Sequence, residues 1–175
     1  MATSASAGAA GPGPLGLAKL FAVAVPAALL GGAYYFQYVR HLPPCEMCWW
    51  QRYAHMAALA FAVIALLAGR MPDRGRSFVW LAALAILASG LIGFYHAGVE
   101  AGIFEGFTQC TSLVGGGSGS NDDLLKAIIA APIVRCDQVP WSLFGISMAG
   151  WNAILSAIGA LVVLWLSLKR SPVRI

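Results

Sequence analysis

Four long apolar runs, separated by shorter polar segments, dominate this chain. They cover residues of about 17–38, 46–68, 78–97 and 143–168. Each run reaches the roughly 20 residues that an α-helix needs to cross the hydrocarbon core of a membrane. The pattern predicts an all-α membrane protein, a four-transmembrane-helix bundle that forms a single membrane domain over residues 15–170.

The two ends of the chain lie outside these runs. Residues 1–14 are uncharged and rich in alanine, glycine, serine and proline, which predicts a disordered tail. This tail lacks the basic start of a signal peptide, so we expect no cleavage. Residues 171–175 form a second, very short tail.

The loop at about 98–142 is the longest segment between two apolar runs. Its middle contains Gly115, Gly116, Gly117 and Gly119, which predict a flexible tether. Acidic residues then follow Asn121, and apolar residues recur at helical spacing at Leu124, Leu125, Ile128 and Ile129. We expect a short amphipathic helix here, which either lies on the outer membrane surface or packs on the bundle.

Composition and charge support a membrane protein and indicate its orientation. The chain is 59% hydrophobic and 10% charged, whereas about 25% of the residues of soluble proteins are charged. The net charge of +4 does not indicate nucleic-acid binding, because the few basic residues lie between apolar runs. Most of them fall on the side of both termini, which should be cytoplasmic: Lys19, Arg70, Arg74, Arg76, Lys169, Arg170 and Arg174. All four cysteines then lie on the outer side.

The second apolar run opens with a Cys-x-x-Cys pair, Cys45 and Cys48, directly after Pro43-Pro44. Proline is tolerated at the first turn of a helix, so both cysteines should lie in that turn. The free N–H groups and the dipole of a helix N-terminus favour thiolates. Arg52, one turn beyond Cys48, would stabilise a Cys48 thiolate or charge developing on an electron acceptor. The stretch therefore predicts a redox centre.

Three other interpretations of these residues remain. The Cys-x-x-Cys pair could be half of a zinc site, although the other two cysteines lack ligand spacing. The cysteines could form inert disulfides, and Arg52 could extend its charge to the membrane interface.

The second pair of cysteines, Cys110 and Cys136, brackets the glycine tether. A disulfide between them would stabilise the folded state by about 3.5 kcal/mol, because it lowers the entropy of the unfolded chain. It would be either a static staple or a mobile bond that exchanges with a soluble partner.

Three stretches resemble the bacterial disulfide-bond formation protein B (DsbB) family over nearly all of the chain beyond the first tail. They are Pro43–Arg52, then Tyr95–Glu100 with His96, and lastly Cys110 together with the segment Ile133–Ser142 around Cys136. The triple glycine of the outer loop departs from the family pattern, so the resemblance does not extend to the length of this loop or to partner docking.

The resemblance implies an enzyme of the bacterial inner membrane that reoxidises a periplasmic thiol oxidase of the DsbA type. Cys110 would form the mixed disulfide with this partner, and Cys136 would exchange with Cys45. Cys48 would face a membrane quinone, ubiquinone or menaquinone, in a thiolate–quinone contact assisted by Arg52. His96 matches the family's quinone-side histidine. No metal or flavin is expected.

Several neighbouring residues have simpler explanations. On pattern alone, His96 and Glu100 form an interfacial i,i+4 pair. Trp49 fits an outer aromatic belt, or it walls the quinone pocket beside Cys48. His55 is expected to be a packed or hydrogen-bonded core histidine, and Asn152 to join two helices.

Two alternatives to this function remain. One is a quinone and thiol enzyme like the vitamin K epoxide reductases, in which the active pair lies near the last span. The other is a non-enzymatic membrane scaffold held by disulfides or zinc.

Overall fold

The structure is a computed structural model that describes residues 13–106 and 134–169. Within these ranges, four helices are long and apolar enough to cross a membrane, which confirms the predicted bundle. A short 3-10 helix, η1, and a two-stranded antiparallel hairpin complete the described elements. In chain order they are α1 (Pro14–Tyr38), α2 (Glu46–Leu67), η1 (Ala68–Arg70), α3 (Arg76–Glu100), β1 (Ser142–Leu143), β2 (Ile146–Ser147) and α5 (Met148–Leu168).

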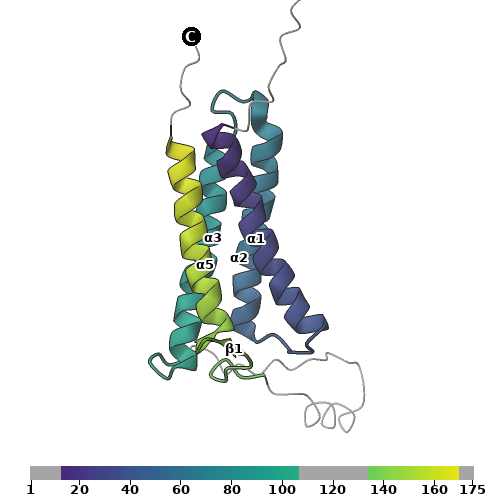
Figure 1. Cartoon of the computed structure of the whole chain (residues 1–175), viewed down its shortest axis with the longest axis vertical. Helices are drawn as coiled ribbons and strands as arrows, with labels where there is room; N and C mark the ends of the chain where they lie inside the picture. The colour runs from purple at the N-terminus through teal and green to yellow at the C-terminus, as the bar shows by residue number, and fades with distance from the viewer. Residues whose placement is uncertain (1–12, 107–133, 170–175) are drawn as a thin grey trace, which may run out of the picture.

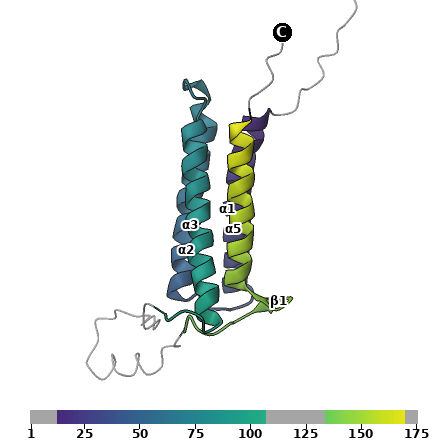
Figure 2. The ribbon, with the colours of Figure 1, turned by 90° about the vertical axis from the view of Figure 1, so that its left-hand side faces the viewer.

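The four long helices pack side by side (Figures 1 and 2). α3 packs against α2 and α5, and α1 packs against the same two helices from the other side. The core at one end is built largely from small residues, among them Ala18, Ala62 and Ala82, all fully buried. Small side chains let helix backbones approach closely, which is how membrane helices gain packing energy without a hydrophobic driving force.

A glycine makes a close helix contact between α3 and α5. A Cβ atom added to Gly93 would lie 2.9 Å from Nδ2 of Asn152 and 3.0 Å from the carbonyl oxygen of Ala149. A Cβ atom on Gly31 in α1 would meet nothing within 4 Å. The two positions therefore form a matched pair for testing the packing.

We expect Gly93→Ala to destabilise the protein by about 1–3 kcal/mol, because the methyl group overpacks a rigid backbone contact. Gly31→Ala should leave stability unchanged, or raise it by up to about 1 kcal/mol through helix propensity. Thermal unfolding of both variants in one detergent checks this. Equal melting temperatures for the two variants would contradict the packing described here.

The fourth apolar run begins with a hairpin rather than with helix. The expected span started at 143, whereas α5 starts at Met148. Phe144 and Gly145, between β1 and β2, have φ values of 53° and 77°. Such a pair of left-handed residues is typical of the tight turn that joins two antiparallel strands. The sequence did not indicate this turn, because Leu143, Phe144 and Ile146 continue the apolar run on both sides of Gly145.

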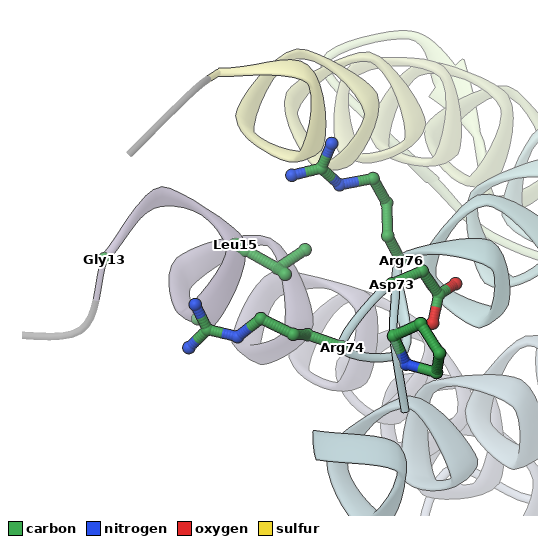
Figure 3. Close-up of a pocket in the computed structure, with 7 residues that line it drawn as sticks. Gly13, Leu15, Asp73, Arg74 and Arg76 are labelled. Atoms are coloured by element: carbon green, nitrogen blue, oxygen red, sulfur yellow. The ribbon is translucent and has the colours of Figure 1, made fainter. Parts of the chain in front are cut away.

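The opposite end of the bundle carries the basic turn between α2 and α3. Asp73 accepts hydrogen bonds from the backbone N–H groups of Gly75 and Ser77 and from the Ser77 hydroxyl. These bonds lower the pKa of Asp73 to about 2 and cap the start of α3. Figure 3 shows Arg74 and Arg76 extending from this turn beside the first turn of α1, around a cavity of about 320 Å³.

Some expectations fall outside the described residues. They are most of the first tail (1–12), the glycine tether and amphipathic helix within 107–133, and the end of the chain (170–175). Cys110 lies in the second of these segments.

Candidate functional site

The Cys-x-x-Cys pair lies at the start of α2, where the chain turns into the helix. Cys45 is the N-cap, and its sulfur accepts a hydrogen bond from the backbone N–H of Cys48 at 3.4 Å. Both cysteines are free thiols, and their sulfur atoms lie 2.9 Å apart. The hydrogen bond to Cys48 and then burial raise the pKa of Cys45 far above its usual value. The Cys45 thiol donates this hydrogen bond to the Cys48 sulfur.

Cys136 lies in the same buried cluster as this pair. The cluster contains Cys45, Met47, Val99 and Cys136, with Cys48 packed against it. Cys136 is disulfide-bonded, and it is only 3% exposed. The fold thus brings together a cysteine of the long loop between α3 and α5 and the Cys-x-x-Cys pair, which lie about 90 residues apart in sequence.

His96, near the end of α3, contacts the pair from the other side. Its Nε2 atom lies 3.6 Å from the Cys45 sulfur and 3.8 Å from a carboxylate oxygen of Glu100. Its Nδ1 atom lies 3.0 Å from Nε2 of Gln51 in α2. His96 is 3% exposed, so it is a buried member of the thiol centre and not only an interfacial partner of Glu100.

Arg52 points toward α1, and its hydrogen bonds go to residues of that helix rather than to Cys48. Its guanidinium donates to the side-chain oxygen of Gln37 and, at 3.2 Å, to the carbonyl oxygen of Ala33. It also lies about 5 Å from the ring centres of Tyr34 and Trp49. The guanidinium is therefore fixed by α1 in an aromatic setting, where cation–π attraction adds to the hydrogen bonds.

A cavity of about 690 Å³ connects these residues. α1 and α5 diverge toward this end of the bundle (Figure 1), and the cavity lies between them and α2. Its walls are mostly apolar, from Leu29, Phe36, Trp141 and neighbouring residues of α1, α5 and the segment 134–143. Its polar lining includes Cys45, Cys48, Gln51, Arg52, His55, His96, Glu100 and Asn152. Trp49 is not among the lining residues; it packs on Arg52.

Cys45, Cys48 and His96 also meet the minimal description of a metal site, because their ligand atoms lie within 4.8 Å of one another. The sulfur separation differs from that of a zinc-bound pair. Tetrahedral zinc with Zn–S bonds of about 2.3 Å holds two thiolates roughly 3.8 Å apart. The 2.9 Å separation observed here is shorter. The two sulfur atoms would have to move apart by about 0.9 Å to bind one zinc ion together.

Comparison with known proteins gives a consistent result. The family model "Disulfide bond formation protein DsbB" matches residues 17–166. The chain belongs to the disulfide bond formation protein B family.

Individual relatives agree with this assignment. Disulfide bond formation protein B of Azoarcus sp. is 32% identical over 152 residues, which cover 82% of this chain and 87% of the relative. Disulfide bond formation protein B 2 of Pseudomonas aeruginosa is 30% identical over 148 residues, 79% and 85% of the two chains. An uncharacterized protein of Rickettsia prowazekii is 27% identical over 79% of each chain. No solved structure matches significantly.

Membership in the DsbB family makes this chain a multi-pass membrane protein of disulfide-bond formation, and therefore an oxidoreductase. Sequence reasoning singled out the cysteines, Arg52 and His96, but not two of their partners, Gln37 and Gln51. Gln37 was hidden in the first apolar run. Gln51 is a polar residue inside the second apolar run, and this position could have marked it as a partner.

The predicted core histidine is confirmed. His55 Nε2 lies 2.9 Å from Oδ1 of Asn152, so the two residues join α2 to α5. Asn152 also donates to Gln51 and Ser89. These buried polar side chains form a hydrogen-bonded network beside the cavity.

Proposed function

We propose that this chain is a thiol:quinone oxidoreductase that reoxidises a soluble disulfide oxidase of the DsbA type. The observation that carries the proposal is the cavity between α1, α2 and α5. One largely apolar chamber contains the free thiol pair, a buried arginine and a buried histidine. An apolar electron acceptor that enters from the membrane can reach a thiol there without crossing water.

The electrons would pass through two thiol–disulfide exchanges. A thiolate of the partner attacks Cys110 of a Cys110–Cys136 disulfide, and the partner's second thiolate then resolves this mixed disulfide. The reduced loop pair next attacks the Cys45–Cys48 disulfide through Cys136, forming a Cys136–Cys45 bond and releasing Cys48 as thiolate. Cys110 attacks Cys136, which restores the loop disulfide and releases Cys45. Each exchange transfers two electrons.

The cavity fits a quinone head group, since its lining is apolar except at the thiol end. A bound quinone supplies an acceptor for two electrons and two protons. Cys48 would face it as the reacting thiolate, while Arg52 holds a positive charge beside the same space. Because Gln37, Ala33, Tyr34 and Trp49 fix the guanidinium, this charge needs no rearrangement when negative charge develops.

We further propose that the thiol end faces the periplasm and that both termini are cytoplasmic. The charges of the two ends support this orientation. Arg70, Arg74 and Arg76 lie in or beside the turn between α2 and α3, at the end opposite the thiols. Basic residues concentrate on the cytoplasmic side of bacterial membrane proteins.

An anaerobic titration tests the proposal. Fully reduced protein in detergent is mixed with increasing amounts of a soluble quinone analogue, and free thiols and quinone absorbance are followed together. We expect one quinone to be reduced for every two thiols lost, with Cys45–Cys48 among the disulfides found by peptide mapping. Unchanged quinone absorbance would overturn the proposal. Stoichiometric zinc that protects both thiols would support the scaffold alternative.

A further inference from the structure

We propose that Asn152, acting through Gln51, holds His96 in the tautomer that carries its proton on Nε2, so that His96 donates a hydrogen bond to Cys45 rather than accepting its proton. The inference rests on the proposed function only for what this bond does in turnover. The tautomer itself follows from hydrogen bonds among buried residues of α2, α3 and α5.

The orientation of the Asn152 amide is fixed by its neighbours. Nδ2 lies 2.8 Å from Oε1 of Gln51 and 3.1 Å from the carbonyl oxygen of Ser89. Both of these oxygens only accept hydrogen bonds, so the Asn152 nitrogen must face them. Oδ1 then faces Nε2 of His55 at 2.9 Å, and His55 must be the donor. Reversing the amide would place its oxygen against two acceptors, Oε1 of Gln51 and the carbonyl oxygen of Ser89.

Gln51 connects the fixed amide of Asn152 to His96 on α3. Its Oε1 is occupied by Asn152, so its Nε2 faces the opposite way. The two hydrogens of Nε2 meet two acceptors, the carbonyl oxygen of Met47 at 3.2 Å and Nδ1 of His96 at 3.0 Å. Nδ1 must therefore present its lone pair. A neutral imidazole then carries its single proton on Nε2.

The Nε2 proton faces the groups that surround the thiol centre. The sulfur of Cys45 lies 3.6 Å from Nε2, and Glu100 lies at 3.8 Å. The imidazole also makes a hydrogen bond to the main chain of Cys136. With its lone pair directed at Gln51, His96 has no free acceptor for the Cys45 proton. It donates to the sulfur instead, and a donor stabilises a thiolate more than a thiol.

This donor acts at one point of the proposed exchange sequence. When Cys110 attacks Cys136 of the Cys136–Cys45 mixed disulfide, the S–S bond to Cys45 breaks and its electron pair remains on the Cys45 sulfur. The His96 N–H faces that sulfur. Asn152 is thus a positioning residue, which touches neither the sulfur nor the cavity's reacting groups directly.

The same network does not conduct protons. A relay requires groups that take up one proton and release another, as imidazoles and carboxyls do. Gln51 and Asn152 are amides and stand between His96 and His55. The network therefore sets the orientation of His96.

Nitrogen NMR of histidine-labelled protein tests the tautomer. The chain contains three histidines, so single substitutions assign each signal. For reduced wild-type protein at neutral pH, we expect His96 to show the Nε2–H pattern. A wild-type His96 in the Nδ1–H form would overturn the inference.

Two variants test the network. Asn152→Leu leaves the Gln51 amide free to turn, so His96 should populate both tautomers. Gln51→Glu places an acceptor opposite Nδ1, which should move a proton onto that atom. Ser156→Ala is the control: its hydroxyl contacts Asn152 and His55 but lies outside the path to His96, so the wild-type pattern should remain. An unchanged tautomer in both test variants would refute the role of Asn152 and Gln51.

The catalytic consequence is measured separately. In Asn152→Leu, release of the Cys45 thiolate should slow about tenfold, the effect of weakening one charge-assisted hydrogen bond. Quinone affinity should change little. If the NMR pattern holds while no quinone is reduced, the proposed function fails and the tautomer inference stands.

Discussion

Replacing Cys48 with serine is expected to abolish reduction of quinone by this protein. Cys48 lines the cavity, where its thiolate would react with the quinone. A serine hydroxyl at this position is a poor nucleophile and cannot form a disulfide with Cys45. Removing a nucleophile from a catalytic group typically costs several orders of magnitude, so turnover should fall by about a thousandfold or more. Initial rates with a soluble quinone and a dithiol donor measure the loss.

The control for this experiment is Cys45→Ser. This variant also stops multiple turnovers, but it keeps the Cys48 thiolate beside the cavity. It should still change the absorbance of bound quinone, and Cys48→Ser should not. The pair Cys110 and Cys136 should exchange with a small dithiol in both variants. Quinone reduction at the wild-type rate by Cys48→Ser would contradict the assigned role.

Arg52→Leu is expected to raise the quinone KM by about tenfold to a hundredfold. That range corresponds to the loss of a hydrogen bond to a charged group in a buried setting. Arg52 is 6% exposed and lines the cavity, so its charge acts on whatever occupies that space. Steady-state rates at varied quinone concentration give the KM, and exchange of the loop pair with a dithiol should be unaffected.

Gln37→Met is the matched control, because it removes the main partner of Arg52 and leaves the charge. We expect a smaller rise in KM, since Ala33, Tyr34 and Trp49 still hold the guanidinium. Arg52→Lys should fall between the two, because an ammonium group cannot reproduce the planar contacts. A wild-type KM in Arg52→Leu would exclude the arginine from quinone binding.

The bundle itself could be predicted from hydrophobicity alone. A membrane helix must satisfy its own backbone hydrogen bonds, so a long apolar run has few alternatives to a spanning helix. The position of Cys45 and Cys48 also followed from local rules, since Pro43-Pro44 marks the helix start and three residues separate neighbours on one face. Such features depend on adjacent residues, which the sequence displays directly.

The partners of these residues depend on helix packing, which the sequence does not display. Helical spacing placed Arg52 below Cys48, but rotation of α2 in the bundle directs the guanidinium to Gln37 on α1. The hydrogen bond between Asn152 and Gln51 joins residues 101 positions apart. Only the packing of the helices brings these two residues together, so no sequence motif could predict this hydrogen bond.

One coupled assay tests the central claim most directly. Catalytic amounts of the purified chain are mixed with a reduced DsbA-type oxidase and excess quinone, and partner thiols and quinone absorbance are recorded together by stopped flow. We predict one quinone reduced for each disulfide formed in the partner, with all four cysteines required. Disulfides that form in the partner without consumption of quinone would contradict the account.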